Sequence, residues 1–179
     1  GPDNYAGVTW ANLPQDQNRT LFIGWMSNWL YGQQVPSQSW RSAMTVAREL
    51  SLIDINGTLL LKSAPAKELE ALRADEIEVN QASNLPSQAV EINAKLDGSD
   101  DFALTFSNES GEKLVINKEF GLVSVDRTLA GKSDFHADFG AIHSAPMSWK
   151  AQELRIFLDA SSVEVFVNGG EIVMTSLLF

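Results

Sequence analysis

The stretch Ile23-Gly24-Trp25-Met26-Ser27-Asn28-Trp29 carries two of the five tryptophans in the chain. Around it lie three further short elements: Asp3-Asn4-Tyr5-Ala6, Trp40-Arg41-Ser42-Ala43-Met44 and Arg48-Glu49-Leu50. A tryptophan face can stack on the apolar C–H face of a sugar ring while its N–H donates to a hydroxyl. The cluster therefore predicts the wall of a sugar pocket or, alternatively, the core of a β-sheet, where aromatic side chains are often buried.

Outside this stretch, apolar and polar residues mostly alternate with a period of two between turn signals. Asn56-Gly57 is the strongest short-range hairpin signal in the chain, and Asn168-Gly169-Gly170 is a second one. The pattern predicts an all-β protein. We expect strands over residues 6–12, 21–26, 43–50, 59–63, 76–81, 90–96, 102–107, 113–117, 122–126, 153–159, 162–167 and 171–175.

One short helix interrupts this pattern. Residues 66–73 follow Pro65, consist of good helix formers and place Leu69 and Leu72 on one face. Aromatic residues crowd before this helix, whereas short, regularly spaced strands follow it, as in a sandwich. We therefore expect a first unit over residues 1–64, a helical linker over residues 65–74 and a β-sandwich over residues 75–179.

Composition limits the possible partners. Thirteen Lys and Arg stand against 23 Asp and Glu, a net charge of −10, which argues against nucleic acid because phosphate binding needs basic side chains. No apolar run approaches the roughly 18–20 residues that span a bilayer, so we expect no membrane partner. The chain has no cysteine, which excludes disulfides, thiolate nucleophiles and cysteine-bound zinc. An uncharged sugar remains compatible with this acidic chain.

The four elements quoted above resemble, in order and spacing, the last propeller blade of glycoside hydrolase family 32, the β-fructosidases (levanases, exo-inulinases and invertases). One departure is Ala47, which stands before Arg48 where the family usually has Pro. Residues 126–128, 154–159 and 161–170 resemble the family's C-terminal β-sandwich. The resemblance implies an all-β fold, with the last blade of a five-bladed β-propeller followed by an incomplete C-terminal β-sandwich.

The resemblance also concerns catalysis. Members of the family use an Asp nucleophile and a Glu acid/base, the carboxylate pair of retaining glycosidases. Their Trp-Met-Asn-Asp-Pro-Asn-Gly-like, Arg-Asp-Pro and Glu-Cys motifs are absent from this sequence. We therefore expect no catalytic residue in this chain. It would be the C-terminal part of a fructan- or sucrose-hydrolysing glycosidase, inactive alone, that supplies support and one aromatic wall of the fructosyl pocket.

By resemblance, Trp29 is the best candidate for lining the fructosyl subsite, with Trp25, Asp3 and Tyr5 behind it. Asp3 could instead be a buried anchor for a turn, and Tyr5 could belong to the core. Arg41 and Arg48 are expected to hold the blade together through carboxylate or backbone pairs.

The resemblance implies two further expectations: the missing N-terminal propeller blades as a partner, and a secreted or periplasmic location. A homo-oligomer, with a second copy of the chain as partner, stays open. Two other functions stay open. The sandwich could be a lectin-like carbohydrate-binding module, or it could mediate dimerisation. Because an isolated blade has unpaired edges and an uncovered apolar face, residues 1–63 should pair with a missing partner, pack on the sandwich or self-associate.

No metal or cofactor site is predicted. His136 and His143 lack the three or four converging ligands that a metal needs. The acidic residues 97–101 lack the spacing and the closing Glu of a calcium loop, so a polar turn is favoured. On the strand expected over residues 76–81, Glu76 and Glu78 would face the same way, which is typical of an exposed face and not of a catalytic pair.

Overall fold

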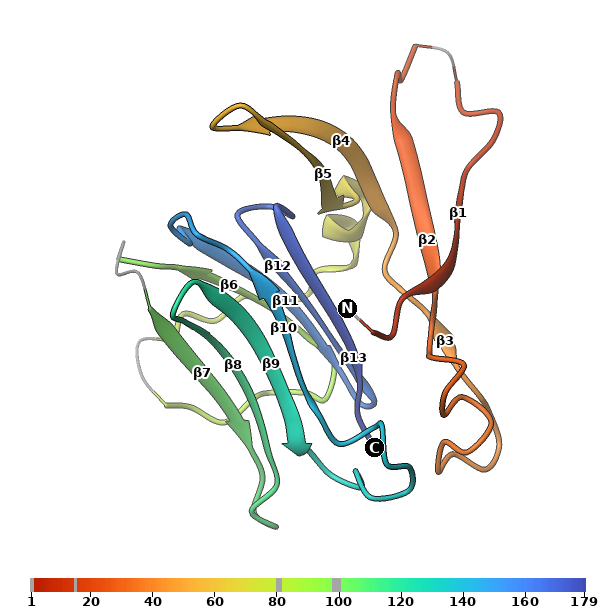
Figure 1. The fold of residues 1–179 in the computed structure, drawn as a ribbon, viewed down its shortest axis with the longest axis vertical. Coiled ribbons are helices and arrows are strands. Elements are labelled where there is room, and N and C mark those ends of the chain that lie inside the picture. The colour runs from red at the N-terminus through yellow and green to blue at the C-terminus, as the bar shows by residue number, and fades with distance from the viewer. Residues whose placement is uncertain (1, 15, 80–81, 98–100) are drawn as a thin grey trace.

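The structure, a computed structural model, describes residues 2–14, 16–79, 82–97 and 101–179. Figure 1 shows three antiparallel sheets. The N-terminal sheet is built from β1 (Tyr5–Thr9), β2 (Thr20–Met26), β3 (Ala43–Met44), β4 (Arg48–Ile55) and β5 (Thr58–Pro65). Its strand order is β1-β2-β4-β5, and β3 pairs with β2.

The other two sheets form the sandwich. One has the order β10-β9-β8-β7, from β7 (Phe102–Ser107), β8 (Lys113–Glu119), β9 (Leu122–Leu129) and β10 (Ile142–Pro146). The other has the order β13-β12-β11-β6, from β6 (Val90–Lys95), β11 (Glu153–Asp159), β12 (Ser162–Val167) and β13 (Ile172–Leu177).

Alternation along the strands places the core of the sandwich between these two sheets. Ile116 on β8, Val125 on β9, Ile156 on β11 and Val165 on β12 are completely buried in one cluster. Their sequence neighbours on β8, β9 and β11 are half-buried, because alternate residues of a strand lie on opposite faces of the sheet. On β12 the neighbours Glu164 and Phe166 are buried as well, because that face packs against Arg48 of the N-terminal sheet.

Both hairpin signals form the predicted turns. Ile55 pairs with Thr58, and Asn56 and Gly57 both have positive φ angles, +53° and +83°, as a two-residue hairpin loop with the strand twist requires. Residues 168–170 also have positive φ angles and join β12 to β13. Turn chemistry is local, so the sequence alone predicts it well.

Three expected elements differ. The helix is a 3₁₀-helix, η1 (Lys67–Leu72), with no buried residue; of its apolar pair, Leu69 is half-buried and Leu72 is exposed. The expected strand over residues 43–50 divides into β3 and β4, because the backbone leaves the sheet there and the Val46 N–H donates to Glu164 at 2.6 Å. Residues 76–79 form no strand and are exposed: polar and apolar residues alternate along them, but they pair with no strand in the described part of the chain.

One strand, β10, is absent from the prediction. It pairs with β9 at the edge of its sheet and ends at Pro146, a residue that strands tolerate only at edges or ends. The turn-forming residues before it obscure its short alternation. Residues 80–81, which belong to the strand expected over 76–81, and residues 98–100, which belong to the acidic turn, lie outside the described residues.

The N-terminal sheet packs on the sandwich, one of the three arrangements expected for it. Strand β13 contacts both β2 and β5. Arg48 of β4 forms a buried ion pair with Glu164 of β12 and donates to the Thr175 hydroxyl of β13 at 2.8 Å. Burial raises the pKa of the Glu164 carboxyl, and the Arg48 guanidinium opposes this shift.

Candidate functional site

Three aromatic residues lie on β1, on β2 and on the turn that follows β2. Tyr5 of β1 lies directly opposite Trp25 of β2 in the strand register. The Trp25 and Trp29 ring centroids are 5.0 Å apart, with the ring planes tilted by 49°. Trp29 is 66% exposed and Tyr5 is 57% exposed, whereas Trp25 is half-buried. We call Tyr5, Trp25 and Trp29 the aromatic patch.

Trp29 projects from a tight turn that Asn28 holds together. The Asn28 side-chain oxygen accepts from the Leu30 N–H at 3.0 Å, and its amide nitrogen donates to the Pro2 carbonyl at 3.1 Å. The Gly32 N–H donates to the Asn28 carbonyl at 2.7 Å. A β-carbon on Gly32 would lie only 2.9 Å from that carbonyl oxygen, so the turn needs a glycine there. The exposure of Trp29 thus follows from a braced turn and not from a loose loop.

Beneath this turn lies a completely buried polar cluster. The Asp3 carboxylate forms an ion pair with Arg127 of β9 and accepts a hydrogen bond from the Tyr31 hydroxyl. It also accepts from the Leu177 N–H of β13 at 2.8 Å. Arg127 donates in addition to the Tyr31 hydroxyl at 2.8 Å and to the Phe139 carbonyl at 2.7 Å. The cluster joins the chain before β1 and the turn after β2 to both sheets of the sandwich.

Burial is what makes these bonds mutually dependent. Asp3 and Arg127 have no exposed surface, and Arg127 lies 3.9 Å from the centre of the Phe139 ring. Burial raises the pKa of the Tyr31 hydroxyl, the Asp3 carboxylate raises it further, and Arg127 partly opposes both. Tyr31 therefore stays a neutral phenol that donates to Asp3, and each charge has a partner.

The four residues predicted to bind sugar thus fall into two groups. Trp29, Trp25 and Tyr5 form the aromatic patch, while Asp3 lies inside the buried cluster with its carboxylate engaged. These contacts fit the alternative weighed for Asp3, a buried anchor. Whether any of the four touches sugar stays a prediction.

The two arginines singled out in the sequence have different surroundings. Arg48 makes the carboxylate pair expected of it, although its partner Glu164 belongs to the sandwich and not to the same sheet. Arg41 is exposed and lies 3.4 Å from the side-chain oxygen of Gln33.

Sequence reasoning missed the roles of Arg127 and Tyr31. A signal for Arg127 was present, because it continues the inward-facing series Val123, Val125 along β9. An arginine at a core-facing position needs a buried acidic partner. No local pattern identifies that partner as Asp3, which lies 124 residues away.

Within the described ranges, no group of three or more His, Asp or Glu side chains is arranged to hold a metal ion. His143 is half-buried, and burial lowers the pKa of its imidazole. None of the helices in the described residues is long and apolar enough to cross a membrane.

Comparison with known families shows which family the chain belongs to. The sequence pattern described as "Glycosyl hydrolases family 32 C terminal" matches residues 60–179, and "Glycosyl hydrolases family 32 N-terminal domain" matches residues 1–63. The chain belongs to glycosyl hydrolase family 32. The predicted family resemblance and the all-β fold, a propeller-blade sheet followed by a β-sandwich, are confirmed.

Family 32 proteins with assigned activities match the whole chain. A levanase of Bacillus subtilis is 35% identical over 99% of this chain and 29% of that protein. An extracellular exo-inulinase of Aspergillus awamori is 30% identical over all of this chain and 37% of that protein. The chain thus spans about a third of the length of these relatives.

Solved family 32 structures share the fold. The crystal structure of the Aspergillus awamori exo-inulinase superimposes with a TM-score of 0.77 at 25% identity, over 100% of this chain and 38% of that chain. A sucrose-6-phosphate hydrolase of Lactobacillus gasseri gives the same TM-score at 23% identity, over 99% of this chain and 36% of that one.

Proposed function

We propose that this chain is the C-terminal part of a retaining glycosidase that hydrolyses fructans or sucrose. In this proposal the N-terminal sheet supplies one aromatic wall of the fructosyl pocket, and the sandwich supports that wall. The observation that carries the proposal is the aromatic patch, in which an exposed Trp29 lies against Trp25 on a turn braced by Asn28. Relatives named as levanase, exo-inulinase and sucrose-6-phosphate hydrolase support the substrate class.

Hydrolysis itself needs groups that the patch lacks. A retaining glycosidase places two carboxyl groups about 5 Å apart across the scissile bond. Asp3, the acidic member of the predicted site, is buried and paired with Arg127. We therefore assign the nucleophile and the acid/base to a part of the protein upstream of these residues, and the chain alone contributes binding and support.

Exposed apolar side chains on the N-terminal sheet indicate where upstream blades would pack. Val8 and Trp10 lie on or next to β1, and Leu52, Leu59 and Leu61 lie on the β4–β5 hairpin; all are exposed. Large apolar patches on a monomer commonly mark a contact surface. In this proposal residues 1–64 form the last blade, residues 65–74 the linker and residues 75–179 the sandwich, in a secreted or periplasmic protein that could assemble as a homo-oligomer.

A kinetic experiment tests the role of Trp29. In a protein that includes the upstream blades, Trp29→Ala should raise KM for levan, inulin or sucrose about tenfold, the loss of roughly 1.4 kcal/mol of binding. It should leave the free energy of unfolding within about 0.5 kcal/mol, because the side chain is mostly exposed. Phe120→Ala is the control, at an aromatic side chain that is 89% exposed on the turn between β8 and β9 and lies outside both the patch and the N-terminal sheet. An unchanged KM in Trp29→Ala would contradict the proposal.

A further inference from the structure

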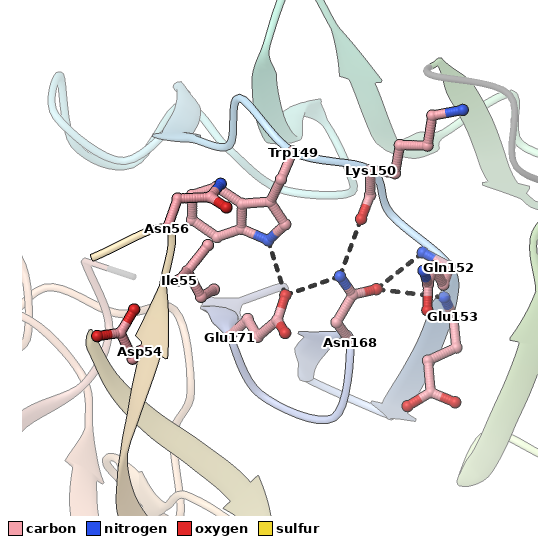
Figure 2. Close-up of a pocket in the computed structure, with 9 residues that line it drawn as sticks. All are labelled: Asp54, Ile55, Asn56, Trp149, Lys150, Gln152, Glu153, Asn168 and Glu171. Carbon is pink, nitrogen blue, oxygen red and sulfur yellow. Dashed lines mark hydrogen bonds between the residues drawn. The ribbon is translucent and has the colours of Figure 1, made fainter. Parts of the chain in front are cut away.

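A concave surface lies where the N-terminal sheet meets the sandwich. Figure 2 shows it between the β4–β5 turn, which contributes Asp54, Ile55 and Asn56, and the segment leading into β11. The turn between β12 and β13 closes it with Asn168 and Glu171. Its volume is about 440 Å³, within the roughly 300–1,000 Å³ of small-molecule pockets. We call it the groove.

The groove has an aromatic side chain in a fixed orientation. The Trp149 indole N–H donates to a carboxylate oxygen of Glu171 at 2.7 Å, and the Asn168 amide donates to the same oxygen at 2.7 Å. Asn168 also donates to the Lys150 carbonyl at 2.9 Å and accepts from the Gln152 N–H at 2.8 Å. This network, drawn in Figure 2, holds the half-buried indole beside the β4–β5 turn. Because the indole is already held in place, a ligand that stacks on it would cost less conformational entropy on binding.

The polar groups around Trp149 disfavour an anionic ligand. Three carboxylates line the groove, from Asp54, Glu153 and Glu171, whereas the Lys150 side chain points away from Trp149 (Figure 2). Side-chain amides of Asn56 and Gln152 add both donors and acceptors. A ligand with many hydroxyl groups can satisfy donors and acceptors together.

Apolar surface continues beyond the indole. A neighbouring hollow of about 410 Å³ shares Trp149 and Glu171 with the groove and is lined on its other side by Leu60, Pro146 and Ile172. Apolar C–H faces on one side and hydroxyls on the other are the two surfaces that a sugar ring presents. The adjoining hollow gives room for more than one ring.

We propose that the groove binds a neutral oligosaccharide, with one ring stacked on Trp149 and its hydroxyls bonded to the side chains of Asp54, Gln152 and Glu171. The site uses none of the residues of the aromatic patch and is assembled only where the N-terminal sheet meets the sandwich. The choice of fructosyl oligosaccharide as probe rests on the proposed function.

Indole NMR of the ¹⁵N-labelled chain during titration with a short inulin-type fructo-oligosaccharide tests this site. The five tryptophans give separate indole signals, and the conservative variant Trp149→Phe identifies one of them. We expect the Trp149 signal to shift as sugar is added up to about 10 mM. That concentration is high enough to detect a single site with a dissociation constant of about 1 mM. Trp149→Ala should weaken the affinity at least about tenfold, whereas Trp10→Ala should leave it unchanged.

Gln152→Ala is a second test that stays informative if the Trp149 variants do not fold. The Gln152 side chain is exposed, and the hydrogen bond to the Asn168 side-chain oxygen comes from the Gln152 backbone N–H, which the substitution keeps. It should weaken binding about three- to tenfold, the loss of one or two hydrogen bonds. An unmoved Trp149 signal, or equal affinity in Trp149→Ala and the unmutated chain, would overturn the proposal. If only the Trp25 and Trp29 signals shift, the groove proposal fails while the proposed function stands. A shift confined to Trp149 supports the groove, and the proposed function is then decided by the Trp29→Ala kinetics in the protein that includes the upstream blades.

Discussion

At the scale of single residues, the buried pair Asp3–Arg127 is the most consequential feature. It links the chain before β1 to the sandwich, and both side chains are completely buried. A charge in such a place is stable only while its partner is present. The same cluster holds Tyr31, two residues after Trp29, so the position of the aromatic patch depends on an arginine of the sandwich.

Arg127→Met should therefore destabilise the chain by about 3–5 kcal/mol, because it leaves the Asp3 carboxylate buried without a counter-charge. Urea unfolding followed by tryptophan fluorescence measures this. The double variant Arg127→Met/Asp3→Asn should lose less than the sum of the two single variants, since it removes both charges together. A loss below about 1 kcal/mol in Arg127→Met would show that the pair is not the anchor described above.

At the scale of elements, turns were predictable and pairing was not. Asn56-Gly57 forms its hairpin because the positive φ angles are a property of those two residues. Glu76 to Val79 alternate as a strand would, yet remain unpaired, and β10 pairs although its alternation is weak. Whether an alternating segment becomes a strand depends on a neighbour that can lie far away in sequence.

The contact between the N-terminal sheet and the sandwich offers an element-scale prediction at Gly170. Its φ angle is +106°, and a β-carbon there would lie 2.2 Å from the Ser63 carbonyl oxygen. Gly170→Ala should therefore destabilise the chain by about 1–3 kcal/mol more than the backbone strain alone, since the two sheets must move apart.

Gly111→Ala is the control for Gly170→Ala. Gly111 also has a positive φ angle, +82°, but open space surrounds its would-be β-carbon. Comparing the two variants by urea unfolding separates backbone strain, which both share, from the collision with Ser63. Equal destabilisation would show that the close approach of the β12–β13 turn to β5 matters little.

At the scale of the whole molecule, the sequence predicted the parts and not their joining. The family motifs and the alternation gave a blade-like sheet, a sandwich and the aromatic residues of the patch. The Arg48–Glu164 and Asp3–Arg127 pairs join residues 116 and 124 positions apart, and the groove exists only where the two parts meet. No local pattern specifies such contacts, although a core-facing arginine on β9 does signal that a buried acid must exist.

The central claim is that this chain provides support and a binding wall for a fructosidase whose reacting carboxylates lie elsewhere. The most direct test is an assay of the purified 179-residue chain on levan, inulin and sucrose, with release of reducing sugar measured over long incubation. We predict no turnover above the uncatalysed background. Turnover that persists through purification and disappears in Trp29→Ala would contradict the claim, because the chain would then hold its own catalytic pair.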